Sequence, residues 1–201
     1  KTAPTVNSVA ISSASGVQNS LLNAGDNVSV TATFSESVIV DNASGTPTLT
    51  LVVGSTNRTA TYASGSGSTP LVFQYTIQAG ETDSDGISIE ANVLALNSGT
   101  ISDAAGNNAT LTHSAVSANS SYMVDTTAPT VSGGVTISGA SGVQNNLLNA
   151  GDVVSVTATF DENVSVTGTP QLTLVVGSDN RTATYTSGSG GTTLVFQYII
   201  Q

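Results

Sequence analysis

An internal repeat constrains this chain more than any other feature of its sequence. Three segments recur in the same order, about 125 residues later: Thr2–Val6 as Thr127–Val131, Leu21–Asp26 as Leu147–Asp152, and Arg58–Tyr62 as Arg181–Tyr185. The repeat predicts two domains, residues 1–125 and residues 126–201. The second copy reaches only Gln201, the counterpart of Gln78, so we expect it to be incomplete, with its final strands missing. Either the chain is cut from something longer, or the gap is a groove that a neighbouring subunit's strand completes.

Alternating apolar and polar residues indicate strands. In Asn27–Phe34, valine, alanine and phenylalanine occupy every second position, and serine or threonine lies between them, as in a half-buried strand. Turn-rich clusters separate the runs, and none carries a helical period. We therefore predict an all-β fold of tandem Ig-like antiparallel β-sandwiches, the second truncated at its C-terminus. The expected strands are Val6–Ile11, Asn27–Phe34, Thr48–Val53, Arg58–Tyr62, Leu71–Ile77, Ile87–Leu96, Ala109–Ser114 and Ser121–Val124.

The amino-acid composition limits the classes of partner that the chain can bind. Only 8% of the residues are charged, against roughly 25% in an average soluble protein, and the net charge is −10. Such a surface repels phosphate backbones and anionic lipids, so we expect no nucleic-acid binding and no membrane insertion. The 13 acids favour hard cations instead. With no cysteine, a disulfide framework and a thiolate metal site are excluded.

Four motifs carry a family resemblance. They are Asp125-Thr126-Thr127-Ala128-Pro129, Thr33-Phe34-Ser35-Glu36, Glu81-Thr82-Asp83-Ser84-Asp85-Gly86 and Asp103-Ala104-Ala105-Gly106-Asn107. Their order and spacing resemble the Ig-like extender repeats of very large bacterial surface adhesins. The resemblance implies secretion to the cell surface, stacking against neighbouring repeats, Ca²⁺ at some domain junctions, and a stalk role that supports adhesion or biofilm formation.

A candidate metal site follows from the expected strand order. Successive loops of such a sandwich fall on alternate ends, and acidic turns gather at the end where the next domain begins. Loop carboxylates suit Ca²⁺, which accepts six to eight oxygen ligands in loose geometry. The alternative is that turns select aspartate for its backbone conformation and leave it solvated. The candidates at the junction are Glu81, Asp83, Asp85, Asp125 and Glu162, with Asp26 or Asp161; a weaker group at the other end is Glu36, Asp41 and Asp103.

The remaining polar and aromatic residues favour structural roles. We expect His113, the only histidine, on a surface strand. Arg58 and Arg181 recur beside a turn, which favours pairing with carboxylates or carbonyls over ligand recognition. The tyrosines at strand positions favour packing over sugar stacking, and the acids lie in Gly- and Ser-rich turns, so we expect no enzyme. Those tyrosines are Tyr62, Tyr75, Tyr185 and Tyr198.

Two other functions remain open from sequence. The repeats could be subunits of an extracellular filament or surface layer that self-associates through edge strands. They could also bind a ligand such as a host glycan, which requires a flat or concave recognition face. In every case the sequence favours a secreted, extracellular protein.

Overall fold

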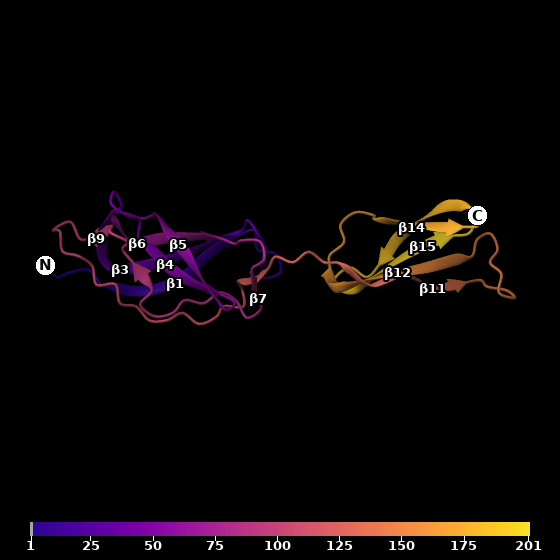
Figure 1. Ribbon diagram of the computed structural model, residues 1–201, viewed down its shortest axis with the longest axis horizontal. Helices are drawn as coiled ribbons and strands as arrows, with labels where there is room; N and C mark the ends of the chain where they lie inside the picture. The colour runs from indigo at the N-terminus through magenta and orange to yellow at the C-terminus, as the bar shows by residue number, and fades with distance from the viewer. Residues whose placement is uncertain (1) are drawn as a thin grey trace. The chain divides into compact units, whose positions relative to one another are not determined.

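The computed structural model describes residues 2–201 and is all-β (Figure 1). It contains two compact units, Lys1–Thr127 (unit 1) and Ala128–Gln201 (unit 2). Residues 2–201 contain no helix of the length and hydropathy that crossing a membrane requires. The strands of unit 1 are β1 (Val6–Ser15), β2 (Leu21–Leu22), β3 (Asn27–Asp41), β4 (Thr48–Val53), β5 (Thr56–Ser64), β6 (Ser68–Thr76), β7 (Thr82–Asp83), β8 (Leu94–Ala95), β9 (Thr100–Ser102) and β10 (Met123–Asp125). Those of unit 2 are β11 (Val131–Ser141), β12 (Val153–Val164), β13 (Gln171–Val176), β14 (Asp179–Ser187) and β15 (Gly191–Ile199).

Strand β3 is the central strand of unit 1. Its apolar residues alternate with serine and threonine, which places every second side chain in the core. It pairs antiparallel with β1 on one side and with β6 on the other. The core residues that it contributes, all at most 2% exposed, are Val28, Val30, Ala32, Phe34 and Val38.

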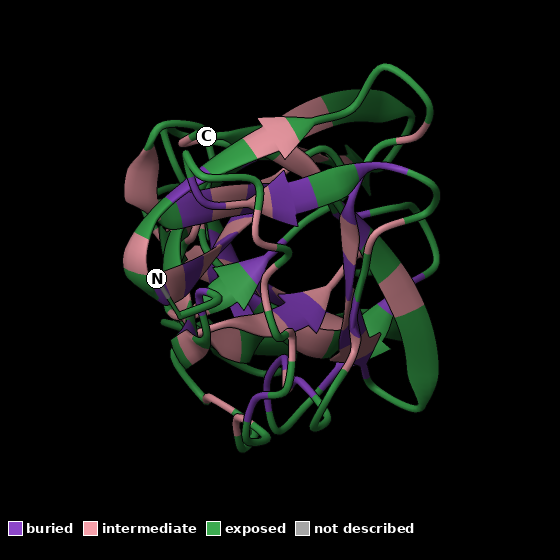
Figure 2. Cartoon of the chain, turned by 90° about the vertical axis from the view of Figure 1, so that its left-hand side faces the viewer, coloured by how far each residue is buried: buried purple, intermediate pink, exposed green. Residues whose placement is uncertain are grey.

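Unit 1 is built on a large sheet with the order β1-β3-β6-β5-β4-β8, and β9 pairs with β3. A smaller sheet, β2-β10-β7, lies at the end where the chain leaves the unit. Buried and exposed residues alternate along the strands, and some connecting segments also carry buried residues (Figure 2). The antiparallel large sheet and the short second sheet agree with the predicted β-sandwich architecture.

Residues 79–125 close unit 1. Ser88 exchanges two backbone hydrogen bonds with Val52 on the outer edge of β4, and β8 extends the same edge. Met123 and Val124 pair in parallel with β2. This segment therefore covers a sheet edge and places Ile87 and Ile89 in the core.

Unit 2 is a single sheet with the order β11-β12-β15-β14-β13. Its strands repeat β1, β3, β6, β5 and β4 in the same pairing order. Even the irregularities recur: β1 slips against β3 between Ile11 and Ser13, and β11 slips against β12 between Ile137 and Gly139. Such shifts mark β-bulges, so the two copies share backbone detail as well as sequence.

Two expected strands are absent as continuous strands. Within Ile87–Leu96, only Leu94 and Ala95 belong to a strand, and Asn92 has a positive φ of 60° that interrupts extended backbone. Within Ala109–Ser114, the backbone makes only isolated bridges. In contrast, β3 runs to Asp41, beyond the predicted end at Phe34, because a register shift between Thr33 and Val38 lets it continue.

Candidate functional site

Three of the predicted calcium ligands lie together at one end of unit 1. Asp83, Asp85 and Asp125 line one surface pocket, whose wall also includes Gly54. Backbone pairing brings them there, because Asp83 of β7 lies opposite Val124 of β10. Asp85 is exposed, whereas Asp83 is only 3% exposed.

Asp83 is a turn clamp. One carboxylate oxygen accepts a hydrogen bond from the backbone N–H of Gly86, and the other accepts from the N–H of Gly54, both at 2.8 Å. Gly86 has a φ of +97°, and a side chain there would overlap the backbone of Asn119. The carboxylate therefore ties the β7 loop to the β4–β5 turn, and both of its oxygens already have donors.

Glu81 joins three segments of unit 1. It is 4% exposed, and its Oε1 accepts a hydrogen bond from the Tyr75 hydroxyl and forms an ion pair with Arg58. Its Oε2 accepts from the N–H of Gln78 at 2.9 Å. Burial, followed by the hydrogen bond to Glu81, raises the pKa of Tyr75 above its ordinary value. The prediction that Arg58 pairs with a nearby carboxylate is confirmed.

Asp26 closes the turn before β3. Its Oδ2 accepts a hydrogen bond from the N–H of Asn23 at 2.8 Å, and a side chain at Gly16 would overlap the Asp26 carboxylate. Unit 2 repeats the arrangement with Asp152 and Gly142. The glycine and the aspartate recur in both copies, and this recurrence was the sequence signal for the contact. The prediction of Asp26 as a metal ligand did not take it into account.

The weaker group lies along the β3–β9 pair. Asp41 ends β3 opposite Thr100 of β9, and Asp103 follows β9 directly. Asp103 is buried, and its Oδ1 accepts from the N–H of Ala105 at 2.8 Å and of Asn107 at 2.9 Å. Glu36 was expected in a loop and lies within β3 instead, beside the bulge that prolongs the strand.

Asp161 and Glu162 belong to unit 2, and their predicted loop position is wrong. Both lie within β12, which continues past Phe160 through a register shift as β3 does. Asp161 accepts hydrogen bonds from the N–H of Thr130 at 2.7 Å and from its hydroxyl at 2.5 Å. These bonds, the hydroxyl first, hold the pKa of Asp161 below its ordinary value. The corresponding residue of unit 1 is Ser35, whose hydroxyl accepts from Thr5.

The acids act mainly as internal hydrogen-bond acceptors. Among residues 2–201, no three or more histidine, aspartate or glutamate side chains form a group that could hold a metal ion. The structure thus places three candidates at one pocket but engages both oxygens of Asp83 and of Glu81 internally. Calcium binding by this protein stays a prediction.

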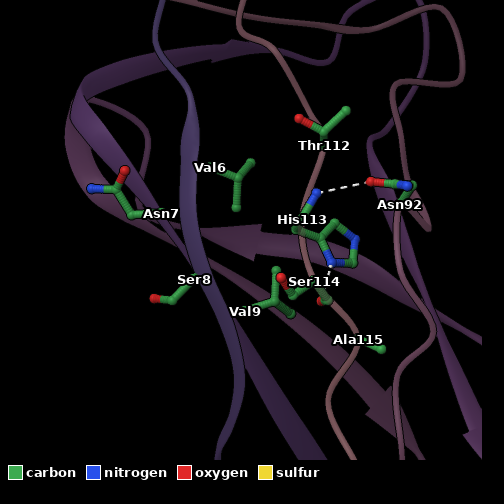
Figure 3. Close-up of a pocket in the computed structure, with 9 residues that line it drawn as sticks. All are labelled: Val6, Asn7, Ser8, Val9, Asn92, Thr112, His113, Ser114 and Ala115. Atoms are coloured by element: carbon green, nitrogen blue, oxygen red, sulfur yellow. Dashed lines mark hydrogen bonds between the residues drawn. The ribbon is translucent and has the colours of Figure 1, made fainter.

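His113 is buried, which corrects its expected place on a surface strand. It is 8% exposed, and its Nε2 accepts from the N–H of Val93 at 3.0 Å. Its Nδ1 faces the Ser114 carbonyl at 2.9 Å (Figure 3). The Asn92 side chain accepts from the His113 N–H. Side-chain bonds replace the backbone ladder here, so the segment packs without forming a strand. The pocket beside the histidine is lined by Val6, Asn7, Ser8, Val9, Asn92, Thr112, Ser114 and Ala115.

The aromatic residues pack as predicted. Tyr62 meets Phe73 edge to face with ring centroids 6.0 Å apart, and Tyr185 meets Phe196 in the same way. Arg181 pairs with Asp179 at 3.0 Å on the surface, in agreement with its predicted role.

One family model matches the chain. It is the X-Pro dipeptidyl-peptidase C-terminal non-catalytic domain, over residues 72–187. The chain belongs to this family. The matched segment begins in β6 and ends with β14, so it takes parts of both units. No curated protein and no solved structure matches the chain significantly.

The buried carboxylate of Glu81 should stabilise unit 1. We expect Glu81→Gln to lower the free energy of unfolding of unit 1 by about 2 kcal/mol, because the charged acceptor of Arg58 and Tyr75 is lost. Urea unfolding, followed by the NMR signals of the unit that carries each substitution, measures the change. Asp179→Asn, which breaks only an exposed ion pair, is the control and should change stability by less than about 1 kcal/mol. Equal effects of the two variants would refute the structural role of Glu81.

The lowered pKa of Asp161 predicts an acid-sensitive contact in unit 2. Its stabilisation is complete above the unfolded-state pKa of about 3.9 and is lost as pH falls through the lower folded-state pKa. We expect Asp161→Ser, which copies Ser35, to keep β11 attached and to remove this part of the acid dependence. Asp161→Ala should weaken the contact at every pH. Amide exchange of Thr130 between pH 2.5 and 6 measures both, and an unchanged acid profile in the serine variant would contradict the assignment.

Proposed function

We propose that this chain is a non-catalytic spacer module of a secreted bacterial surface protein, an extender that supports adhesion. The observation that carries the proposal is the path of the chain through each unit. In unit 1 the chain enters beside Phe34 of the central strand β3 and leaves near the start of that strand. A module of this kind adds length with every copy.

The path is clearest in unit 1. The chain enters where Val6 pairs with Phe34. It leaves at Thr126, whose hydroxyl donates to the Glu81 carbonyl at 3.0 Å and accepts from the Gly80 N–H at 2.9 Å. Figure 1 shows β9, which pairs with the far part of β3, and β7 at opposite ends of this unit. At about 3.4 Å per strand residue, the stretch of β3 between these ends spans about 25 Å.

Unit 2 repeats the entry. The chain enters where Val131 pairs with Phe160, and the Thr130–Asp161 contact holds this point. The path of unit 1 from its entry to its exit is the one that a stalk element requires.

The internal acids support a mechanical role. Three carboxylates accept backbone hydrogen bonds in turns at the end where the chain leaves unit 1: Asp83, Glu81 and Asp26. In unit 2, Asp161 accepts from Thr130, just before the first strand. Hydrogen bonds to charged acceptors are among the stronger ones in proteins. These clamps resist fraying at the points where tension on the chain would act.

Calcium belongs to this proposal as a stabiliser of the acidic pocket at the end of unit 1. Asp85 is exposed there, and Asp125 is partly exposed and uses Oδ1 to accept from the Thr127 N–H at 3.0 Å. Carboxylates of this kind, with backbone carbonyls and water, are the ligands that Ca²⁺ takes.

Calcium should raise the unfolding temperature of unit 1 if it binds at this pocket. Ligand that binds only the folded state stabilises by mass action, so the shift should grow with Ca²⁺ between 0.1 and 10 mM and vanish with chelator. Asp85→Asn should abolish the shift, while Asp179→Asn, which is in unit 2, should keep it. If the unfolding temperature does not shift at any Ca²⁺ concentration, the calcium part of the proposal is wrong and only the spacer part stands.

A spacer must hold its ends at a fixed separation. Because the chain has no cysteine, Asn7→Cys and Thr127→Cys allow clean spin labelling of unit 1. Double electron–electron resonance should give one narrow distance longer than about 20 Å, since β3 separates the two points. A broad distribution, or a short distance, would contradict the spacer.

The family match favours a second candidate. The family is described as the non-catalytic C-terminal domain of X-Pro dipeptidyl-peptidases, so the chain could accompany a peptidase domain in one polypeptide. Assay of the full parent protein for cleavage after X-Pro distinguishes the two. Cleavage would favour an accessory domain, and further tandem copies without activity would favour the stalk.

A further inference from the structure

His113 is a buried titratable side chain that neither the spacer nor the calcium site uses. It is 8% exposed and is the only histidine of the chain. It belongs to residues 79–125, the covering segment of unit 1. Two parts of the covering segment meet at His113, residues 87–96 and residues 109–116.

The two parts are bound to different sides of the large sheet. The Val93 carbonyl accepts a hydrogen bond from the N–H of Thr50 in β4 at 3.3 Å. The Thr110 N–H donates to the carbonyl of Pro4, just before β1, at 2.8 Å. Strand β1 begins the sheet order, whereas β4 lies near its other end. The contact between the two parts therefore joins the two sides of the sheet through the covering segment.

His113 and Asn92 make most of this contact. The Asn92 N–H donates to the His113 carbonyl at 3.3 Å, and the Asn92 side-chain oxygen accepts from the His113 N–H at 2.9 Å (Figure 3). The Val93 N–H donates to Nε2 of the ring at 3.0 Å. Farther along, Ile89 and Val116 exchange two backbone hydrogen bonds at 2.7 and 2.9 Å. The ring thus supplies one of the few bonds that hold the two parts together.

The partners of the ring fix where its hydrogen lies. Nε2 accepts from the Val93 N–H, so this nitrogen carries no hydrogen. Nδ1 faces the Ser114 carbonyl at 2.9 Å, so it carries the hydrogen and donates it. The ring is therefore neutral. A second proton must enter at Nε2, where it meets the Val93 N–H, and its arrival breaks that bond.

The surroundings of the ring offer nothing to stabilise a second proton. Within residues 2–201, the pocket beside the ring is lined from β1 and from both parts of the covering segment, and no lining residue is charged. The one other titratable side chain of residues 87–96 and 109–116 is Glu90, which is exposed. Protonation of the ring and closure of the contact therefore exclude each other.

We propose that His113 is an acid-sensitive latch of unit 1. With a neutral ring, the latch joins residues 87–96 to residues 109–116. When the ring takes up a second proton, the Val93 bond is lost and these two parts separate, while the long strands stay paired. The latch acts independently of the spacer role and of calcium.

Acid weakens the latch because the opened state takes up the proton. A histidine in an unfolded segment has a pKa of about 6.5. The opened state therefore binds more protons than the closed state below this pH, so the latch has its full strength above it and weakens as the pH falls. For one proton, the opening equilibrium rises about tenfold between pH 7.5 and pH 5.5.

Native-state amide exchange of Val93 in the full chain tests the latch. We expect its protection factor, corrected for the intrinsic exchange rate at each pH, to fall about tenfold from pH 7.5 to pH 5.5. Val93 should exchange faster than Val30 of β3 at both pH values, because the opening is local. Ordinary carboxylates titrate below this range, and the α-amino group titrates within it.

Two variants separate the ring from other causes. His113→Gln keeps a side-chain acceptor for the Val93 N–H and cannot titrate, so the protection of Val93 should be the same at both pH values. Asn92→Gly is the matched control, because it removes a bond of the same contact and tolerates the positive φ at this position. Its protection should be lower at both pH values and should still fall about tenfold.

The tautomer gives a test that needs no variant. Ring ¹⁵N NMR at pH 7.5 should show the hydrogen on Nδ1, and a hydrogen on Nε2 would overturn the proposal. Equal protection of Val93 at pH 7.5 and pH 5.5 in the unchanged chain would overturn it as well. So would a fall that persists in His113→Gln, or a Val93 exchange rate equal to that of Val30.

Discussion

A β-sheet leaves one edge and one face unsatisfied unless another segment covers them, and this constraint organises the whole chain. Unit 1 meets it with residues 79–125, most of which are irregular in backbone. Ser88 satisfies the edge of β4, while Ile87 and Ile89 fill the core. The buried acids Glu81 and Asp83 anchor the start of this segment. Glu81 and Asp83 therefore hold the covering segment to the strands of unit 1.

The same constraint explains why the acids attract a metal interpretation. A carboxylate that closes a turn is followed by glycine and serine, and such a run resembles a calcium loop. The hydrogen-bond donors distinguish a turn-closing carboxylate from a metal ligand. Both oxygens of Asp83 accept hydrogen bonds from backbone N–H groups, as in a turn-closing carboxylate. Asp85 and Asp125, at the same pocket, keep more solvent contact and carry the calcium proposal.

Sequence periodicity predicted the regular part of the fold well. Asn27–Phe34 and Thr48–Val53 alternate strictly, because one face of each strand is buried, and both form strands. It failed for Ile87–Leu96 and Ala109–Ser114, whose apolar residues are partly or fully buried. Side-chain hydrogen bonds at Asn92 and His113 hold these segments in place of a backbone ladder. Alternation reports burial of every second residue and does not distinguish a strand from an anchored loop.

The most direct test of this account is native-state amide exchange at two matched positions of the unmodified chain, Val52 and Val175. The account predicts slow exchange at Val52, whose N–H is bonded to Ser88, and fast exchange at Val175 on the edge of β13. Val30 and Val156, in the two central strands, should both exchange slowly. Equal protection of Val52 and Val175 would contradict the claim that residues 79–125 close the sheet of unit 1.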